Sequence, residues 1–317
     1  MRIALMAEEL GGLHHVTAIT GRAPANVDFY TRVLGMRLVK KTVNQDDVSA
    51  YHLFYADRTG SPGTDLTFFD WPFAVPNQAG VPEIAPVTLR VAETSLEWWA
   101  ARLAEHQVAA ERVDGRLAFS DPEGQRLELA GHAGATRFEA WPESPVPEEH
   151  QVRGLHAVRL ASANPQATAD LLRQVMGFSP LAETELEGGD RLYTFGLPGR
   201  ESGSEVSLLL PREPKRSRQG RGGVHHVAFR VGDEAEQKAW RERVLATGLQ
   251  ATPVIDRFYF KSVYFREPGG NLFELATDGP GFTSDEPAAE LGHHLALPPF
   301  LEPRRQEIEA GLTPLPT

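Results

Sequence analysis

The chain has 317 residues, and its composition of 41% hydrophobic and 24% charged residues is that of a soluble globular protein with one large or two ordinary domains. The net charge of −11 disfavours a nucleic-acid or anionic-membrane partner, because both would repel the protein. The lack of cysteine excludes disulfides, thiol catalysis and thiolate metal sites, which fits a cytoplasmic location. The opening residues, 1–12, contain an apolar patch too short for a signal peptide, and no run approaches the roughly 20 apolar residues that a membrane span needs.

Four stretches of the chain repeat one order of predicted elements, in which a strand and a helix are followed by further strands. The first stretch, about residues 12–72, begins with the strand GLHHVTAIT at 12–20. A helix is predicted next, because four apolar residues recur at helical spacing before Gly35. Residues 50–71 then contain two strand-like runs, AYHLFYAD and TDLTFFDW, which are separated by a GSPG turn.

The second stretch, about residues 84–132, contains the strand PVTLRV, an amphipathic helix in SLEWWAARLAEHQV and a hairpin in RLAFSDPEGQRLELAG. The third, about residues 152–211, contains the strand GLHAVRL, a helix in NPQATADLLRQVMGF and the strands RLYTFGL and SEVSLLLP. Residues 131–151 between them are rich in proline, glycine and acids, as is typical of a linker. We therefore predict two domains, residues 1–145 and 146–317, each with two repeats.

The fourth stretch, about residues 223–277, opens with GVHHVAFRV and closes with YFREPGGNLFELATD. A Pro-rich tail at 278–317 follows, with a short amphipathic helix near 302–310 and two histidines, His293 and His294, that we expect to be exposed. A lone βαβββ unit leaves one face of a curved sheet uncovered, so units must pair to form a cup. The sequence thus predicts an α+β fold in which four βαβββ modules form two cupped-sheet barrels.

Two histidines and one glutamate form a candidate metal site. Alternate residues of a strand share a face, so His226 and Glu274 point to the same side of the fourth module, opposite the apolar faces that a helix would cover. The first module repeats the HH pair, and the same alternation puts His15 and Thr17 on one face. Two imidazoles and a carboxylate with open positions are the triad that suits non-haem Fe(II) and O2 chemistry. The alternative is that both HH pairs are structural or exposed.

Alignment of the repeats indicates which modules carry the metal. In the second and third modules, Pro86 and Ala157 occupy the position of His226. Only Glu128, in the second module, matches Glu274. We expect Glu128 to be a partly buried, hydrogen-bonded residue or a surface residue instead of a ligand.

The first and last modules together offer three ligands, so these two modules are expected to share the metal cup and the middle two to share a cup without metal. The first module has an aromatic residue, about Phe68, where the last has its glutamate. Sequential pairing of modules is the simpler default, and it would separate His15 from His226.

At these residues the sequence resembles the vicinal-oxygen-chelate superfamily, which includes glyoxalases, bleomycin-resistance proteins and extradiol dioxygenases. More narrowly, it is similar to the ring-cleaving dioxygenases that open hydroquinones. The resemblance covers nearly the whole chain and is carried by LHHVTAITG, NVDFYTRVLGMRLVKKTVN, YHLFYAD, GSPGTDLTFF, SLEWW, GVHHVAF, DRFYFKSVYFREPGGNLFELATD and GFTSDEP. It implies an Fe(II)-dependent dioxygenase, with Mn(II) as the alternative metal, whose partners are a small aromatic substrate and O2. A homo-oligomer is compatible with it.

The resemblance also implies roles for individual residues. The iron ligands match His15, His226 and Glu274. The positions that line the substrate pocket match His14, Thr17, His225, Arg257 and Tyr264. Strict alternation would send His14 and His225 to the helix face, although a bulge at a strand start could turn them back to the rim. The alternative for these two is an imidazole hydrogen-bonded behind the ligands.

From these roles we expect Tyr264 to hydrogen-bond the reacting oxygen or to act as acid and base. Arg257 is expected to stabilise developing negative charge, and His225 or His14 to take the proton of the distal hydroxyl. The alternatives are an aromatic residue of the cup wall for Tyr264 and a surface residue for Arg257.

Two other functions remain open at this point. A glyoxalase-like metal isomerase or lyase typically uses a second carboxylate, and the first module has an aromatic residue there. A metal-free protein that binds an aromatic drug or quinone would need only an aromatic-lined cup, for which Phe54, Phe68, Phe258 and Phe260 are candidates. The ring substituents, and hydroquinone against catechol, are likewise open.

Overall fold

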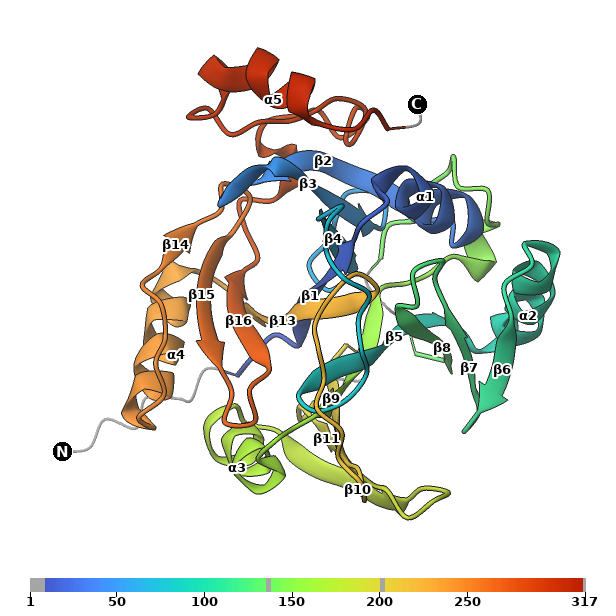
Figure 1. Ribbon diagram of the computed structural model, residues 1–317, viewed down its shortest axis with the longest axis vertical. Coiled ribbons are helices and arrows are strands. Elements are labelled where there is room, and N and C mark those ends of the chain that lie inside the picture. Colours follow the sequence, from blue (N-terminus) through green and yellow to red (C-terminus); the bar gives the residue numbers. More distant parts are fainter. Residues whose placement is uncertain (1–8, 135–137, 200–202, 316–317) are drawn as a thin grey trace.

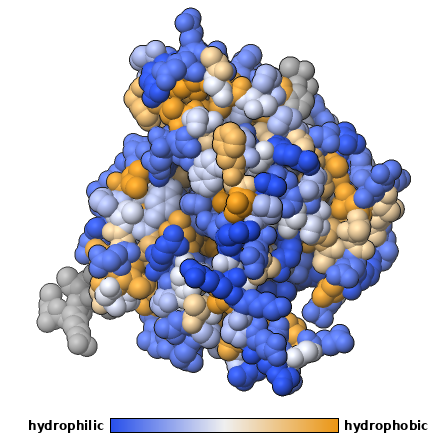
Figure 2. All heavy atoms as spheres, in the orientation of Figure 1, coloured by the Kyte–Doolittle hydropathy of each residue, from blue (hydrophilic) through white to orange (hydrophobic). Residues whose placement is uncertain are grey.

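Two curved eight-stranded sheets form the body of the protein, and each is partly covered by helices (Figure 1). This computed structural model describes residues 9–134, 138–199 and 203–315. The expectation that the apolar patch in residues 1–12 is no signal peptide therefore falls largely outside the described residues. Within the described residues, no helix combines the length and the apolar character needed to cross a membrane. The face in Figure 2 is largely hydrophilic, with apolar residues gathered in several smaller patches.

The predicted order of strand, helix and further strands recurs four times. The first module comprises β1 (Leu13–Thr20), α1 (Ala23–Asp28), β2 (Arg37–Asn44), β3 (Asp47–Ala56) and β4 (Asp65–Asp70). The second comprises β5 (Glu83–Ala92), α2 (Leu96–Glu105), β6 (Ala110–Val113), β7 (Arg116–Ser120) and β8 (Arg126–His132).

The second half of the chain repeats this order. The third module comprises β9 (Leu155–Ala161), α3 (Pro165–Asp170), β10 (Ser179–Glu185), β11 (Arg191–Gly196) and β12 (Glu205–Leu210). The fourth comprises β13 (Gly223–Val231), α4 (Glu234–Ala246), β14 (Ile255–Asp256), β15 (Lys261–Arg266) and β16 (Leu272–Thr277). The exposed strand β10 was not predicted, because its mainly polar residues lack an apolar face.

The first and last modules share one sheet, with the strand order β14-β15-β16-β13-β1-β4-β3-β2. The middle two share the other sheet, in the order β10-β11-β12-β9-β5-β8-β7-β6. The prediction that the outer modules pair is therefore confirmed, and sequential pairing is excluded. Each sheet draws strands from both halves of the chain, and β1 lies antiparallel to β13 at the centre of the first sheet.

The period-two alternation predicted for the fourth module also holds. Val227 and Phe273 belong to the main hydrophobic core, on the side that α4 covers with Trp240. Ala228 and Ala276, on the opposite face, belong to a smaller apolar cluster inside the cup. The cup is thus an enclosed space with its own apolar lining, separate from the core that holds the modules together.

The C-terminal tail, with α5 (Arg305–Gly311), lies across β2 (Figure 1). The predicted tail helix and the exposure of His293 and His294 are confirmed. The tail is nevertheless docked, because the fully buried Lys40 of β2 forms ion pairs with Asp285, at 2.7 Å, and with Glu286. The sequence did not predict this contact.

Candidate metal centre

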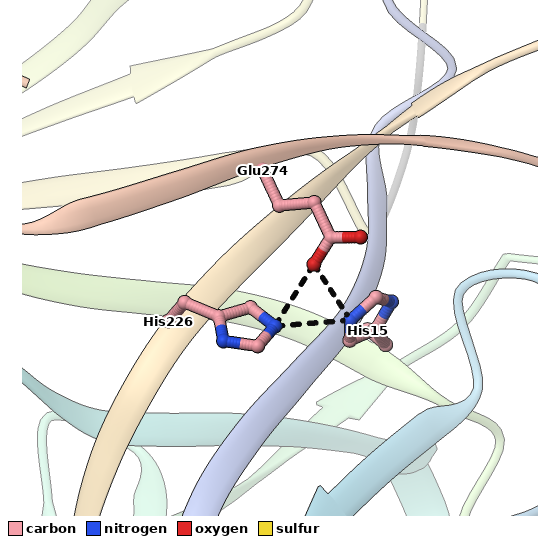
Figure 3. A group of neighbouring side chains, drawn as sticks. All are labelled: His15, His226 and Glu274. Carbon is pink, nitrogen blue, oxygen red and sulfur yellow. Dashed lines mark hydrogen bonds and ion pairs between the residues drawn. The ribbon is translucent and has the colours of Figure 1, made fainter. Parts of the chain in front are cut away.

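Three side chains from three neighbouring strands meet inside the first cup (Figure 3). The Nε2 atoms of His15 on β1 and His226 on β13 are 3.3 Å apart. The Oε2 atom of Glu274 on β16 lies 3.2 Å from the first nitrogen and 2.9 Å from the second. Among the described residues, this is the one group of three histidine or acidic side chains compact enough to hold a metal ion.

The register of the strands explains why these side chains meet. Thr17 pairs with His226 across β1 and β13, and Ala228 pairs with Glu274 across β13 and β16. Since each ligand position lies within two residues of the others along adjacent strands, all three point into the same part of the cup. Their exposed fractions are 3% or less, so the site is shielded from water.

The carboxylate of Glu274 is buried, and the two imidazoles are the polar groups closest to its Oε2, at 2.9 and 3.2 Å. Neither of its oxygens accepts a hydrogen bond of adequate geometry from the described residues. Burial raises the pKa of Glu274, but the neighbouring His15 and His226 outweigh this effect and hold it well below its usual value. A buried, ionised carboxylate is costly unless a cation lies beside it, which here is a protonated imidazole or a bound metal ion.

The hydrogen bonds of His14 orient the proton on His15. The Nε2 of His14 lies 3.1 Å from the backbone oxygen of Thr277, which can only accept, so this nitrogen donates. Burial, followed by the charge of His15, lowers the pKa of His14 to about 3, so its ring is neutral and its Nδ1 carries a lone pair. That Nδ1 lies 2.9 Å from the Nδ1 of His15, which must therefore be the donor. In a neutral His15 ring, Nε2 therefore carries the lone pair and faces Glu274.

A second adjacent pair repeats this contact. The Nδ1 of His225 lies 2.8 Å from the Nδ1 of His226, and burial together with the charge of His226 lowers the pKa of His225 to about 3. His225 borders a separate surface cavity together with Gln219 and Arg266. Both histidines at the HH starts thus lie behind the candidate ligands, and neither lines the cavity beside Glu274.

The cavity next to the three side chains has a volume of about 40 Å³. On a scale of roughly 10–15 Å³ per water molecule, this space holds about three waters. Arg257 and Tyr264 line it, as the resemblance implied, whereas Thr17 does not. Thr42 and His52, which the sequence did not single out, also line it.

Arg257 closes the outer side of the cavity. Its guanidinium donates to the Oδ2 of Asp46 at 2.8 Å and lies 5.5 Å above the ring of Tyr264. Its backbone oxygen accepts from the side chain of Gln45 at 2.8 Å. We call Gln45, Asp46 and Arg257 the mouth of the cup, because they join the β2–β3 turn to the segment after β14.

Tyr264 lies on β15 directly opposite Glu274, and its ring centre is 5.6 Å from that of His226. Burial, and then the negative charge of Glu274, raise the pKa of Tyr264 above its usual value. Its hydroxyl therefore stays protonated and is able to donate a hydrogen bond into the cavity.

The residue of the first module that corresponds to Glu274 is Thr67, and the expectation of Phe68 was wrong by one residue. Thr17 pairs with Thr67 across β1 and β4 as Ala228 pairs with Glu274 across β13 and β16. A shift of one residue moves a side chain to the other face of a sheet, and Phe68 accordingly packs in the core against Tyr30. The first cup thus has a hydroxyl, and no second carboxylate, at this position.

In the second cup, arginines surround the glutamate that corresponds to Glu274. Glu128 is 4% exposed, and its carboxylate accepts from Thr88 at 2.9 Å and from Arg116 at 3.0 Å. Arg159 is 3.5 Å away on the other side. The expectation that Glu128 is a buried, hydrogen-bonded residue is confirmed, since guanidinium groups neutralise its charge.

The sequence model of the Glyoxalase/Bleomycin resistance protein/Dioxygenase superfamily matches residues 12–129 and 154–275. The chain belongs to this superfamily. The resemblance inferred from the HH pairs and the PGG–glutamate strand is thereby confirmed, as is the fold of paired βαβββ modules in two cupped sheets.

Close relatives cover almost the whole chain. A Bacillus subtilis protein named as a ring-cleaving dioxygenase, MhqA, is 44% identical over 97% of this chain and 99% of its own. The chlorohydroquinone/hydroquinone 1,2-dioxygenase of Sphingobium indicum is 33% identical over 96% of both chains. The crystal structure of a Bacillus subtilis protein described as a dioxygenase superposes with a TM-score of 0.91 at 36% identity, covering 98% of this chain and 99% of its own. Maize glyoxalase I, at 15% identity and a TM-score of 0.63 over 89% of this chain and 96% of its own, shares the fold.

Proposed function

We propose that the protein is an Fe(II)-dependent dioxygenase that opens a hydroquinone-type aromatic ring with O2, with His15, His226 and Glu274 as the metal ligands. The observation that carries this proposal is the compact, buried group of two imidazole nitrogens and one carboxylate oxygen, which lie 2.9 to 3.3 Å from one another beside a cavity. The relatives named as ring-cleaving dioxygenases, one of which acts on hydroquinones, support the reaction class. Mn(II) is the alternative metal, because it accepts the same nitrogen and oxygen donors.

The spacing of the three donor atoms fits a metal ion. Two ligands at right angles, each about 2.1 Å from an ion, are roughly 3 Å apart. The separations of 2.9, 3.2 and 3.3 Å among the candidate donors match this value without a change of strand geometry. Three protein ligands on one face of an octahedron leave about three positions for substrate and O2.

The chemistry supplied by the bound iron is the activation of O2 beside a phenolate oxygen of the substrate. Among the protein groups, the protonated hydroxyl of Tyr264 is able to donate a hydrogen bond to that oxygen. The permanent positive charge of Arg257 stabilises negative charge that develops in the ring or on O2. Neither role requires a charged group to enter the cavity from solvent.

The cavity must widen to admit a ring. A benzene molecule fits a cavity of about 150 Å³, well above the 40 Å³ available beside His15 and His226. The mouth is the part best able to move, because Asp46 is 71% exposed and its bond to Arg257 is therefore partly screened by water. We expect substrate binding to displace these side chains outward.

Two features favour this proposal over the other functions considered from the sequence. A glyoxalase-like isomerase would use a second carboxylate, and Thr67 stands at that position. A metal-free cup for aromatic drugs would gain nothing from a fully buried carboxylate between two imidazoles, since burial of such a charge opposes folding.

The test is O2 uptake by protein loaded with Fe(II) under anaerobic conditions and then mixed with hydroquinone, methylhydroquinone or chlorohydroquinone. We expect stoichiometric O2 consumption and, with isotopically labelled O2, a ring-opened product that carries both oxygen atoms. Glu274→Ala is the control that should abolish uptake. Iron-loaded protein that consumes no O2 with any hydroquinone or catechol would overturn the proposal, and conversion of a substrate without O2 would indicate an isomerase.

A further inference from the structure

The wall of the cup that faces the candidate metal centre carries a pair of polar side chains with no assigned role. Thr42 on β2 and His52 on β3 are directly opposite each other in the antiparallel register, so they share a face, and both line the cavity. In the sheet order, β3 is separated from β1 by β4, which puts the two backbones roughly 10 Å apart at about 4.8 Å per strand. The pair therefore lies across the cavity from His15.

A chain of hydrogen bonds determines the tautomer of His52. The hydroxyl of Thr67 donates to the hydroxyl of Thr17 at 2.8 Å, so its only proton is already used. The Nε2 of His52, 3.0 Å from the Thr67 oxygen, must then be the donor in that contact. Burial lowers the pKa of His52 well below its usual value, so the ring is neutral and its Nδ1 is a hydrogen-bond acceptor.

Aromatic contacts fix the orientation of this ring. The centre of the His52 ring lies 3.9 Å from that of Phe54 and 4.5 Å from that of Phe69. Together with the bond to Thr67, these contacts restrain the imidazole from turning, so the accepting nitrogen has a fixed direction.

Thr42 contributes the complementary group. Its side chain is 3% exposed, and its hydroxyl makes no hydrogen bond of adequate geometry within the described residues, although the Tyr259 hydroxyl lies near enough to interact with it. Buried hydroxyls almost always have a well-aligned partner, so this group, which has only a poorly aligned contact with Tyr259, points to a ligand atom that would complete it. The other polar side chains nearby already have partners. The amide of Gln45 donates to the backbone oxygen of Arg257, and the guanidinium of Arg257 donates to Asp46. The hydroxyl of Tyr259 donates to Asp285.

We propose that Thr42 and His52 form the binding site for the second hydroxyl of a para-dihydroxy ring, the one that lies farthest from the metal. The hydroxyl donates to Nδ1 of His52 and accepts from Oγ1 of Thr42. This inference rests on the proposed function, because it assumes that the first hydroxyl lies at the metal. It makes the two residues determinants of specificity for the para arrangement.

The geometry of the ring explains the selectivity. Para oxygens project from opposite sides of a ring, so one can lie at Glu274 while the other reaches across to β2 and β3. In a catechol the two oxygens are adjacent, and both would lie at the metal, which would leave Thr42 and His52 without partners. A chlorine or methyl group in place of the second hydroxyl could not donate to His52. A site built to bind a hydroxyl rejects a ligand that lacks it, because its buried polar groups then remain unpaired.

The test measures binding without turnover. Metal-loaded protein is titrated anaerobically by calorimetry with hydroquinone and with phenol, which lacks the second hydroxyl. The wild type should bind hydroquinone more tightly. Thr42→Val preserves the shape of the side chain, and His52→Phe preserves a ring against Phe54. Each should weaken hydroquinone binding by about tenfold to a hundredfold while phenol binding changes less than about twofold.

Matched variants distinguish this role from a structural one. Thr42→Ser retains the hydroxyl and should keep the preference for hydroquinone, and Ser49→Ala, on an exposed part of β3, should change neither affinity. All variants should retain the metal content of the wild type. The inference would be overturned if Thr42→Val and His52→Phe lost hydroquinone and phenol binding equally, or lost no hydroquinone binding. It would also be overturned if the wild type bound hydroquinone no more tightly than phenol. If the Thr42 and His52 variants lose hydroquinone binding selectively, but the iron-loaded wild type consumes no O2, the hydroxyl site would be supported and only the dioxygenase proposal would be overturned.

Discussion

The Nδ1 atom of His14 lies 2.9 Å from the Nδ1 atom of His15, and the far nitrogen of His14 is anchored on the backbone oxygen of Thr277. In a neutral His15 ring, this relay places the proton on the side away from Glu274. The ligand character of His15 thus depends on a neighbour that does not reach the cavity.

His14→Phe should weaken metal binding without removing a ligand. The variant lets the His15 ring rotate and change tautomer, and loss of such an orienting partner typically reduces metal affinity by about 10- to 100-fold. Metal titration against a fluorescent chelator measures the change. His293→Ala, which removes an exposed histidine from the tail, is the control and should bind metal as the wild type does. Unchanged affinity in His14→Phe would contradict the relay.

Glu274→Ala and Glu128→Ala should differ in metal retention, although the two glutamates occupy equivalent strands. Glu274→Ala removes a candidate ligand and should lower metal affinity by more than the roughly 100-fold expected for an outer contact. Glu128→Ala removes the partner of Arg116 and should leave the bound metal unchanged while it destabilises the second cup. Elemental analysis after dialysis gives the metal content, and equal loss in both variants would mean that the wrong cup was chosen.

Lys40→Met should loosen the C-terminal tail. Removal of the buried ammonium leaves Asp285 and Glu286 without their cation, which we expect to lower the free energy of unfolding by about 2–3 kcal/mol, since both acids retain some contact with water. Limited proteolysis should then cut within residues 278–315 sooner than in the wild type. Lys238→Met, which removes an exposed partner of Glu234, should have little effect on either measurement.

The stability of the metal-free protein should depend on the ionisation of Asp70, at the end of β4. Burial raises the pKa of Asp70 from 3.8 to about 6, against the effect of a hydrogen bond from the backbone of Ala23. A carboxyl group with a raised folded-state pKa favours folding fully below about pH 4, and this contribution is lost as the pH rises through about 6.

Asp70→Asn should therefore be more stable than the wild type at pH 7, by about 1–2 kcal/mol after allowance for partial exposure, and equally stable near pH 4. Urea unfolding in the presence of a chelator, at several pH values, measures the difference. Glu187→Gln at an exposed position is the control. A difference that does not grow between pH 4 and pH 7 would contradict the argument.

The candidate ligands could be predicted from the sequence because strands alternate with a period of two and because the modules repeat. His15 and His226 occupy the same position in two repeated HH pairs, Glu274 is the one acid on its strand, and comparison of the copies excluded the middle modules. The pairing of the first and fourth modules was predicted from the ligands that a metal needs, because only that pairing brings the three side chains together. The usual preference for pairing of consecutive modules would have given the opposite result.

The polar wall of Thr42 and His52 could not be predicted in this way. Thr42 and His52 become neighbours only through the register of β2 against β3. An error of one residue in a predicted register moves a side chain to the other face of the sheet, as happened when Phe68 was expected in the place of Thr67. The two lysines at 40 and 41 illustrate the same limit. They look alike in the sequence, but alternation buries Lys40 under the tail and leaves Lys41 near the surface.

The adjacency of β1 and β13 has a consequence for biosynthesis. The first strand of the sheet leaves the ribosome long before its central neighbour, since His15 and His226 are 211 positions apart. Until then β1 has an open edge with unpaired backbone groups, which is a hazard for aggregation. A nascent chain can therefore assemble the candidate metal centre only after nearly all of it has been translated, and premature termination before β13 would yield a product that lacks this centre and leaves that edge uncovered.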